Sequence, residues 1–122
     1  MIKRWVILQH TLAKESLEGL HFDLLLEDAE YCRTWRLPYI PIVDGPSVEA
    51  VPLPPHKLYW LDREESFVSG GRGWAKRIVS GSFSGSLPSK DLEFVSIEIH
   101  SNSLCGLLVL KNDLCQIFSS PK

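Results

Sequence analysis

The chain has 122 residues, of which 44% are hydrophobic and 23% are charged, and its mean hydropathy is −0.01. This length and composition predict one globular domain over residues 1–122 and exclude a disordered chain. The formal net charge of −2 excludes a strongly basic nucleic-acid binder, so any contact with DNA must come from a local cationic surface.

Short β-branched, aromatic and alternating runs predict strands at Trp5–Gln9, His21–Glu27, Tyr31–Leu37, Trp74–Phe83, Leu92–His100, Leu104–Leu110 and Leu114–Phe118. One short helix is expected over Leu12–Leu20, with Thr11 as its N-cap and Gly19 as its stop. Pro38–Pro55 holds six of the eight prolines and is expected to be an extended loop with at most an edge strand. Together these elements predict a mainly β fold: a small closed or partly closed β-barrel with one or two short helices.

The cysteines and the apolar runs bear on the compartment. The three cysteines are odd in number and show no CxxC spacing, which favours reduced and mostly buried thiols. The apolar stretch before His10 is too short for the core of a signal peptide, and no run approaches the roughly 20 apolar residues of a membrane-spanning helix. We therefore expect a cytoplasmic protein without a membrane partner.

The clearest candidate for chemistry is the pair His21 and Asp23. Residues two apart on a strand project from the same face, so the imidazole and the carboxylate would lie side by side. Such a pair can share a divalent metal, with His10 at the end of a neighbouring strand as the third ligand. Nitrogen and oxygen ligands suit Mn, Fe or Zn. The alternative is a hydrogen-bonded His–Asp pair without a metal, which is the commoner use of an isolated His-x-Asp.

Two further features are compatible with phosphate chemistry. His56 can act as a phosphate donor or a general acid because an imidazole titrates near neutral pH, although a plain loop histidine is the commoner case. Residues 66–90 contain no acidic residue but include a Gly-rich loop, Ser69–Gly73, and the cations Arg72, Lys76, Arg77 and Lys90. Phosphate contacts are expected there, the alternatives being a plain hairpin turn and a solvated strand face. His100 is expected to be structural.

The order of the motifs is more informative than any one of them. Along the chain come Gln9-His10, His21-Phe22-Asp23-Leu24-Leu25-Leu26-Glu27, Thr34-Trp35-Arg36-Leu37-Pro38, Ala50-Val51, His56-Lys57-Leu58, Asp62-Arg63-Glu64, Ser69-Gly70-Gly71-Arg72-Gly73 and Leu104-Cys105-Gly106-Leu107. In this order they resemble the phosphoesterase domain of bacterial DNA ligase D over nearly the whole chain.

This resemblance implies a small β-barrel with a manganese-dependent activity that heals DNA 3′ ends, by removing a 3′-terminal ribonucleotide or a 3′-phosphate. It implies that His10, His21 and Asp23 hold Mn²⁺ or another divalent metal and take part in catalysis. It also implies that His56 contacts the scissile phosphate. The implied partners are DNA 3′ ends, including a primer–template, and a ligase or polymerase that uses the healed end in DNA repair.

The chain departs from the family pattern at several phosphate-binding positions. Leu25, Tyr39 and Val48 stand where the family has an arginine, a lysine and an arginine, and Trp60 stands where it has a tyrosine. His21 also follows His10 by eleven residues, about twice the family spacing. Either Arg72, Lys76 and Arg77 replace the lost contacts, with help from Arg36, or catalysis is weak or absent, because charged contacts to the transition state carry much of the rate.

Three classes of function are therefore open. The first is a metal-dependent 3′-phosphoesterase. The second is a non-catalytic module of the same fold that binds DNA ends or an acidic partner. The third is a non-haem iron oxygenase, in which His-x-Asp and a distal His56 or His100 form a facial triad. The ordered motif series favours the first class and leaves the oxygenase last.

Overall fold

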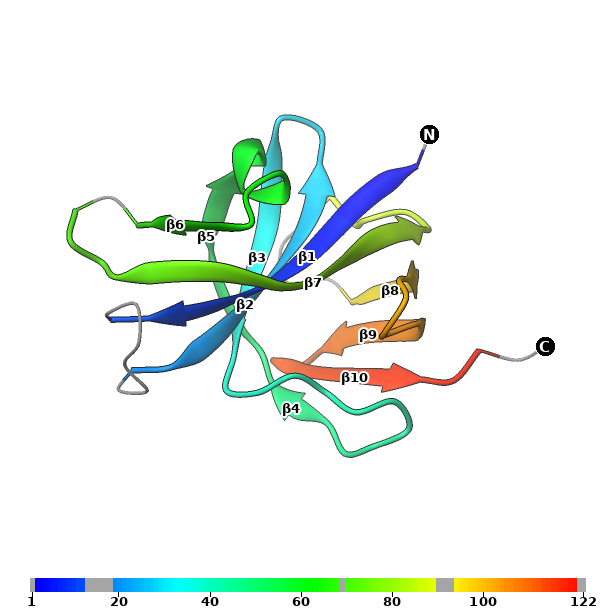
Figure 1. Ribbon diagram of the computed structural model, residues 1–122. Helices are drawn as coiled ribbons and strands as arrows, with labels where there is room; N and C mark the ends of the chain where they lie inside the picture. Colours follow the sequence, from blue (N-terminus) through cyan, green and yellow to red (C-terminus); the bar gives the residue numbers. More distant parts are fainter. Residues whose placement is uncertain (1, 13–18, 69, 90–93, 121–122) are drawn as a thin grey trace.

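The computed structural model describes residues 2–12, 19–68, 70–89 and 94–120. It contains one antiparallel sheet of ten strands in the order β4-β10-β9-β8-β7-β1-β2-β3-β5, with β6 added beside β7 (Figure 1). The strands are β1 (Lys3–Thr11), β2 (His21–Asp28), β3 (Tyr31–Leu37), β4 (Val48–Glu49), β5 (Val51–Lys57), β6 (Glu65–Phe67), β7 (Trp74–Ser84), β8 (Val95–His100), β9 (Gly106–Lys111) and β10 (Leu114–Phe118). A single 3-10 turn in the described residues, η1 (Leu58–Leu61), follows β5.

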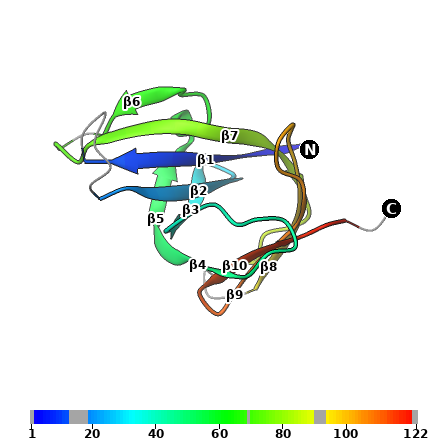
Figure 2. The ribbon, with the colours of Figure 1, turned by 60° about the horizontal axis from the view of Figure 1, so that its bottom comes forward.

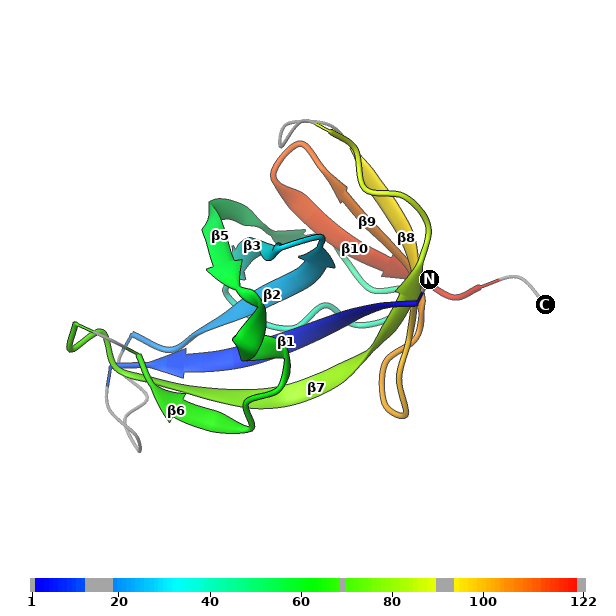
Figure 3. The ribbon, with the colours of Figure 1, turned by 90° about the horizontal axis from the view of Figure 1, so that it is seen from above.

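The sheet curls over so that β8, β9 and β10 fold back toward β1, β2 and β3 (Figures 2 and 3). Its two edge strands, β4 and β5, are consecutive in the chain and joined through Ala50, but they do not pair with each other. The chain itself therefore links the two edges, and hydrogen bonds do not close the barrel. The prolines of β5 suit an edge strand, because proline has no N–H to donate to a further strand. The expected mainly β, partly closed barrel is confirmed.

Strand β7 serves both halves of the sheet. It pairs with β1 over residues 74–83, with β6 over residues 74–76 and with β8 over residues 82–84. Gly81 lies at the transition, where a Cβ would stand 1.8 Å from the His100 carbonyl oxygen. Glycine is thus required for the close approach of the two backbones.

Two apolar clusters cover opposite faces of β1 and β2. The interior core packs residues of β1, β2 and β3 against β8, β9 and β10, and includes Trp5, Ile7, Leu24 and Leu26. The smaller outer core lies beneath η1 and consists of Val6, Leu8, Leu25, Cys32, Trp60, Leu61 and Ala75. Because both faces are buried, β1 and β2 carry continuous apolar runs instead of a clean alternation. The outer core forms the floor of the candidate site.

Several expectations need correction. Thr11, expected as a helix N-cap, is the last residue of β1, and residues 13–18 of the expected helix lie outside the described residues. The expected loop at Pro38–Pro55 holds the edge strand that was allowed there, as most of the seven-residue β5, and the short strand β4 in addition. Neither β6 nor η1 was expected. No helical segment in the described ranges has the length and hydropathy needed to cross a bilayer.

Candidate metal centre

Strands β1 and β2 bring His10, His21 and Asp23 together. In their antiparallel register His10 is directly opposite His21, and Leu8 is opposite Asp23. His10 Nδ1 lies 2.9 Å from His21 Nε2. The Asp23 carboxylate lies 3.8 Å from His10 Nδ1 and 3.5 Å from His21 Nε2. One ligand atom from each residue falls within 4.8 Å of the others, which is compact enough for a single metal ion.

The outer nitrogen of each imidazole is held by the backbone. His10 Nε2 lies 2.6 Å from the Arg72 carbonyl oxygen, and His21 Nδ1 lies 3.2 Å from the Gly19 carbonyl oxygen. A carbonyl oxygen only accepts hydrogen bonds, so both of these nitrogens carry the proton and donate. In the neutral rings, His10 Nδ1 and His21 Nε2 then carry lone pairs. We assign these tautomers from the hydrogen-bond network.

The inner side of the cluster therefore presents only electron-pair donors. Two lone pairs face each other beside a carboxylate, and the buried Asp23 Oδ1 has no hydrogen-bond partner among the described residues. Burial lowers the pKa of His21, an effect that Arg36 and His10 reinforce and that Asp23 and the Gly19 carbonyl oppose. The protonated form of His21 is thus disfavoured. A divalent cation fits this donor set, and the backbone carbonyls supply the outer contacts that orient metal-binding histidines.

A pocket of about 370 Å³ adjoins the cluster, and His10 and Asp23 line it. Its floor is formed by Leu8, Ala75 and Trp60 of the outer core. One wall is the edge strand β5 from Leu53 to Lys57, and the pocket continues onto η1. The pocket therefore joins the cluster of His10, His21 and Asp23 to a surface that is partly apolar and partly cationic.

The predicted phosphate-binding residues separate into two groups. His56, Arg36 and Arg72 line the same pocket as His10 and Asp23. Lys76 and Arg77 are not among the residues that line it. Lys76 is exposed beside the pocket-facing Ala75, so strand alternation turns it to the other face. Arg77 is held by the Leu61 carbonyl oxygen at 3.4 Å and by Glu64 at 3.9 Å.

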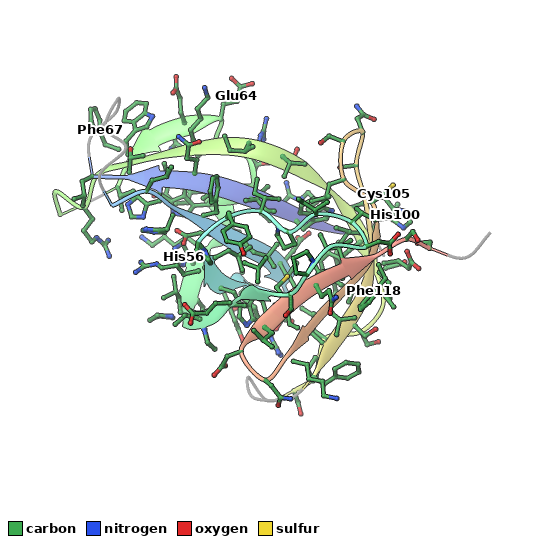
Figure 4. All side chains as sticks on the ribbon, turned by 90° about the horizontal axis from the view of Figure 1, so that it is seen from below. His56, Glu64, Phe67, His100, Cys105 and Phe118 are labelled. Atoms are coloured by element: carbon green, nitrogen blue, oxygen red, sulfur yellow. The ribbon has the colours of Figure 1, made fainter. Side chains whose placement is uncertain are left out.

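The structure also places two residues in the pocket that sequence reasoning did not select. These are Lys57, at the end of β5, and Tyr59, in η1. Their nearness in sequence to His56 is the signal that could have identified them. His100, by contrast, is exposed on β8, far from His56 and outside the pocket (Figure 4).

The Gly-rich loop supports the cluster in a way that its composition did not predict. A backbone N–H cradle for an anion was the expectation, whereas the Arg72 carbonyl binds His10. Gly73 adopts φ +103°, and a Cβ there would stand 1.9 Å from the Thr11 carbonyl oxygen. Only glycine lets the loop pack this closely on the end of β1. Ser69 lies outside the described residues.

Most of the residues that differ from the ligase D phosphoesterase pattern at its phosphate-binding positions are structural here. Leu25 and Trp60 are buried in the outer core, and Val48 is buried in the interior core. Tyr39 is exposed, and the pocket is not lined by it. The cations that face the pocket therefore come from other positions, namely Arg36, Lys57 and Arg72.

Comparison with known proteins adds no assignment. A scan of protein-family models found no match to the sequence, and a search of curated proteins found none either. A functional assignment therefore depends on the geometry of the cluster, on the charges of the pocket and on the resemblance of the ordered motifs.

Proposed function

We propose that the protein is a divalent-metal-dependent phosphoesterase that acts on DNA 3′ ends in DNA repair. The observation that carries the proposal is the pair of inward lone pairs beside Asp23, in a pocket that also presents cations. The lone pairs and the carboxylate suit a metal ion, and the cations of the pocket suit an anion. The resemblance of the ordered motifs to the ligase D phosphoesterase domain supports DNA ends as the source of that anion.

The charges of the pocket support a phosphate ligand. Arg36 and Arg72 line it together with one carboxylate, that of Asp23. A slightly acidic protein thus presents a local cationic surface at the cluster, as binding of a phosphate requires.

Each group has a defined role in the proposed reaction. When bound by His10, His21 and Asp23, Mn²⁺ or another divalent ion supplies Lewis-acid polarisation of a phosphoryl oxygen. Arg36 and Arg72 neutralise the phosphate and orient it. His56 Nδ1 lies 3.2 Å from the Pro54 carbonyl and donates to it, so Nε2 is the nitrogen available to a ligand. In its protonated form His56 would donate that proton to the phosphate or to the leaving oxygen.

The product of this reaction defines the partners. Hydrolytic release of a 3′-terminal ribonucleoside leaves a 3′-phosphate, and hydrolysis of that phosphate leaves the 3′-hydroxyl that a ligase or a polymerase consumes. We therefore propose a primer–template or a nicked end as the DNA partner, with a ligase or polymerase acting next.

A non-catalytic binding module is the second candidate. The buried Leu25 favours it, because the family has a phosphate-binding arginine there. It predicts that metal binding is absent or purely structural and that salt-sensitive DNA binding occurs without turnover. The two-histidine, one-carboxylate set is also the composition of iron oxygenase sites, but the ordered motifs favour a phosphoesterase.

The test is turnover of a primer–template that carries a 3′-phosphate or a 3′-terminal ribonucleotide, with Mn²⁺ and with EDTA. Wild type is expected to release phosphate or nucleoside only with the metal, and His21→Ala is expected to lose that activity. His100→Ala is the matched control, since that histidine is exposed and outside the pocket. Metal-loaded, folded wild-type protein without turnover of either end would reject the phosphoesterase in favour of the binding module.

A further inference from the structure

The pocket reaches beyond the metal cluster to Lys57 and Tyr59, which have no role in the reaction described above. We infer that these two residues form a second subsite, which binds the nucleoside beside the reacting phosphate and the phosphate on that nucleoside's 5′ side. This inference rests on the proposed function and narrows its substrate class. The recognised unit is a nucleoside 3′,5′-bisphosphate within a strand, and not an isolated phosphate monoester.

The size and lining of the pocket leave room for a nucleoside. Clefts that enclose organic ligands have volumes of roughly 300–1,000 Å³, and this pocket, at about 370 Å³, falls within that range. Away from the cations its lining is largely apolar, and comprises Leu53, Pro54, Pro55, Trp60 and Val68. A phosphate gains nothing from apolar walls, whereas a sugar and a base bury area against them.

Tyr59 offers a fixed aromatic surface at this end of the pocket. Its neighbour Trp60 is buried and meets the Tyr59 ring edge to face, with centroids 5.0 Å apart. The Arg63 guanidinium lies 5.1 Å from the centre of the Tyr59 ring. These contacts restrain a side chain that is still 42% exposed. An exposed, restrained aromatic ring is the usual stacking partner of an unpaired base.

Lys57 supplies the charge for a second phosphate. Its side chain is exposed and forms no ion pair in the part of the chain that the structure describes. Its backbone, however, is held in place at the end of β5, where it pairs with Tyr31 of β3. Lys57 lies only two residues before Tyr59, so one short segment presents a cation and an aromatic ring together. A nucleotide within a strand can use both groups, because its phosphate can pair with Lys57 while its base stacks on Tyr59.

The test is an NMR titration in EDTA, where no metal-dependent turnover can occur. The probes are thymidine 3′,5′-bisphosphate, thymidine 3′-monophosphate and inorganic phosphate. Wild type is expected to bind the bisphosphate about tenfold more tightly than the monophosphate. Lys57→Ala should remove this difference and leave binding of inorganic phosphate unchanged. Tyr59→Ala should weaken both nucleotides but not inorganic phosphate, and Lys76→Ala, an exposed lysine outside the pocket, is the control.

Equal affinities of wild type for the two nucleotides would overturn the inference. So would a Lys57→Ala variant that weakens inorganic phosphate as much as the bisphosphate, because that pattern indicates a general electrostatic effect. The titration does not depend on catalysis. Discrimination between the probes by a protein that turns over no DNA end would therefore reject the proposed reaction and retain the subsite.

Discussion

Replacing Asp23 with asparagine is expected to raise the stability of the metal-free protein and to abolish its stabilisation by metal. Asp23 is 5% exposed, and its Oδ1 has no hydrogen-bond partner among the described residues. Without a metal, the carboxylate faces two imidazole lone pairs. An asparagine of the same shape removes the charge and offers N–H groups to those lone pairs.

The size of the effect follows from the unsatisfied carboxylate. A buried polar group without a partner costs about 1–3 kcal/mol, so the variant should gain that amount in EDTA. For a chain of 122 residues, 1 kcal/mol corresponds to about 4 °C in Tm, so the expected rise is about 4–12 °C. With Mn²⁺ at a hundred times its Kd, wild type should gain about 2.7 kcal/mol, or roughly 10 °C, and the variant almost nothing.

Differential scanning calorimetry at pH 8, in EDTA and in Mn²⁺, measures both effects while His21 is neutral, because burial lowers its pKa. Asp28→Asn is the matched control on the same strand. Asp28 accepts a bond of 2.7 Å from the buried Arg33 guanidinium, so its neutralisation should lower Tm in both media. A fall in Tm for Asp23→Asn in EDTA, or equal stabilisation of the variant and wild type by Mn²⁺, would refute the reasoning.

Three further outcomes are expected. Burial lowers the pKa of His21 from its ordinary value of 6.5, so the unfolded chain binds more protons. The free energy of unfolding of the metal-free protein should therefore be highest above pH 6.5 and decrease as the pH falls below that value. In urea titrations this decrease should be shallower for His21→Gln than for wild type, and equal slopes for the two proteins would contradict the expectation. Gly73→Ala places a Cβ 1.9 Å from a backbone oxygen and should weaken Mn²⁺ binding by about tenfold or more by displacing the loop that holds His10. Gly71→Ala, where φ is +68° but nothing lies within 4 Å of an added Cβ, should strain the turn without this collision and weaken Mn²⁺ binding less. Cys105 should be the one thiol that a maleimide labels rapidly in the native protein, because burial raises the pKa of the other two to about 12; fast labelling of all three would contradict the fold.

The strands could be predicted where local pattern and tertiary packing agree. The bounds expected for Tyr31–Leu37 and Leu114–Phe118 are those observed, because turn residues flank an alternating or apolar run on each side. Glu65–Phe67 has no such pattern and is a strand only because β7 pairs with it. The 3-10 turn at Leu58–Leu61 was missed for a related reason, since the burial of Trp60 and Leu61 on β1 and β2 sustains it.

The candidate site could be anticipated only in part. The period of a strand placed His21 beside Asp23, but the β1–β2 register that sets His10 opposite His21 depends on the whole sheet. The Arg72 carbonyl on His10 could not be predicted, because a backbone group has no signature in the sequence. The sequence also does not show which of several nearby cations point to the same face. Lys76 and Arg77 were therefore grouped with Arg72, although they do not line the pocket.

The most direct test of the central claim is anomalous diffraction from a crystal soaked with Mn²⁺. We predict one strong manganese peak within coordinating distance of His10 Nδ1, His21 Nε2 and the Asp23 carboxylate, with the outer nitrogens still bonded to the Arg72 and Gly19 carbonyls. A peak elsewhere, or no peak with the two histidines sharing a proton, would contradict the metal centre and the function proposed from it.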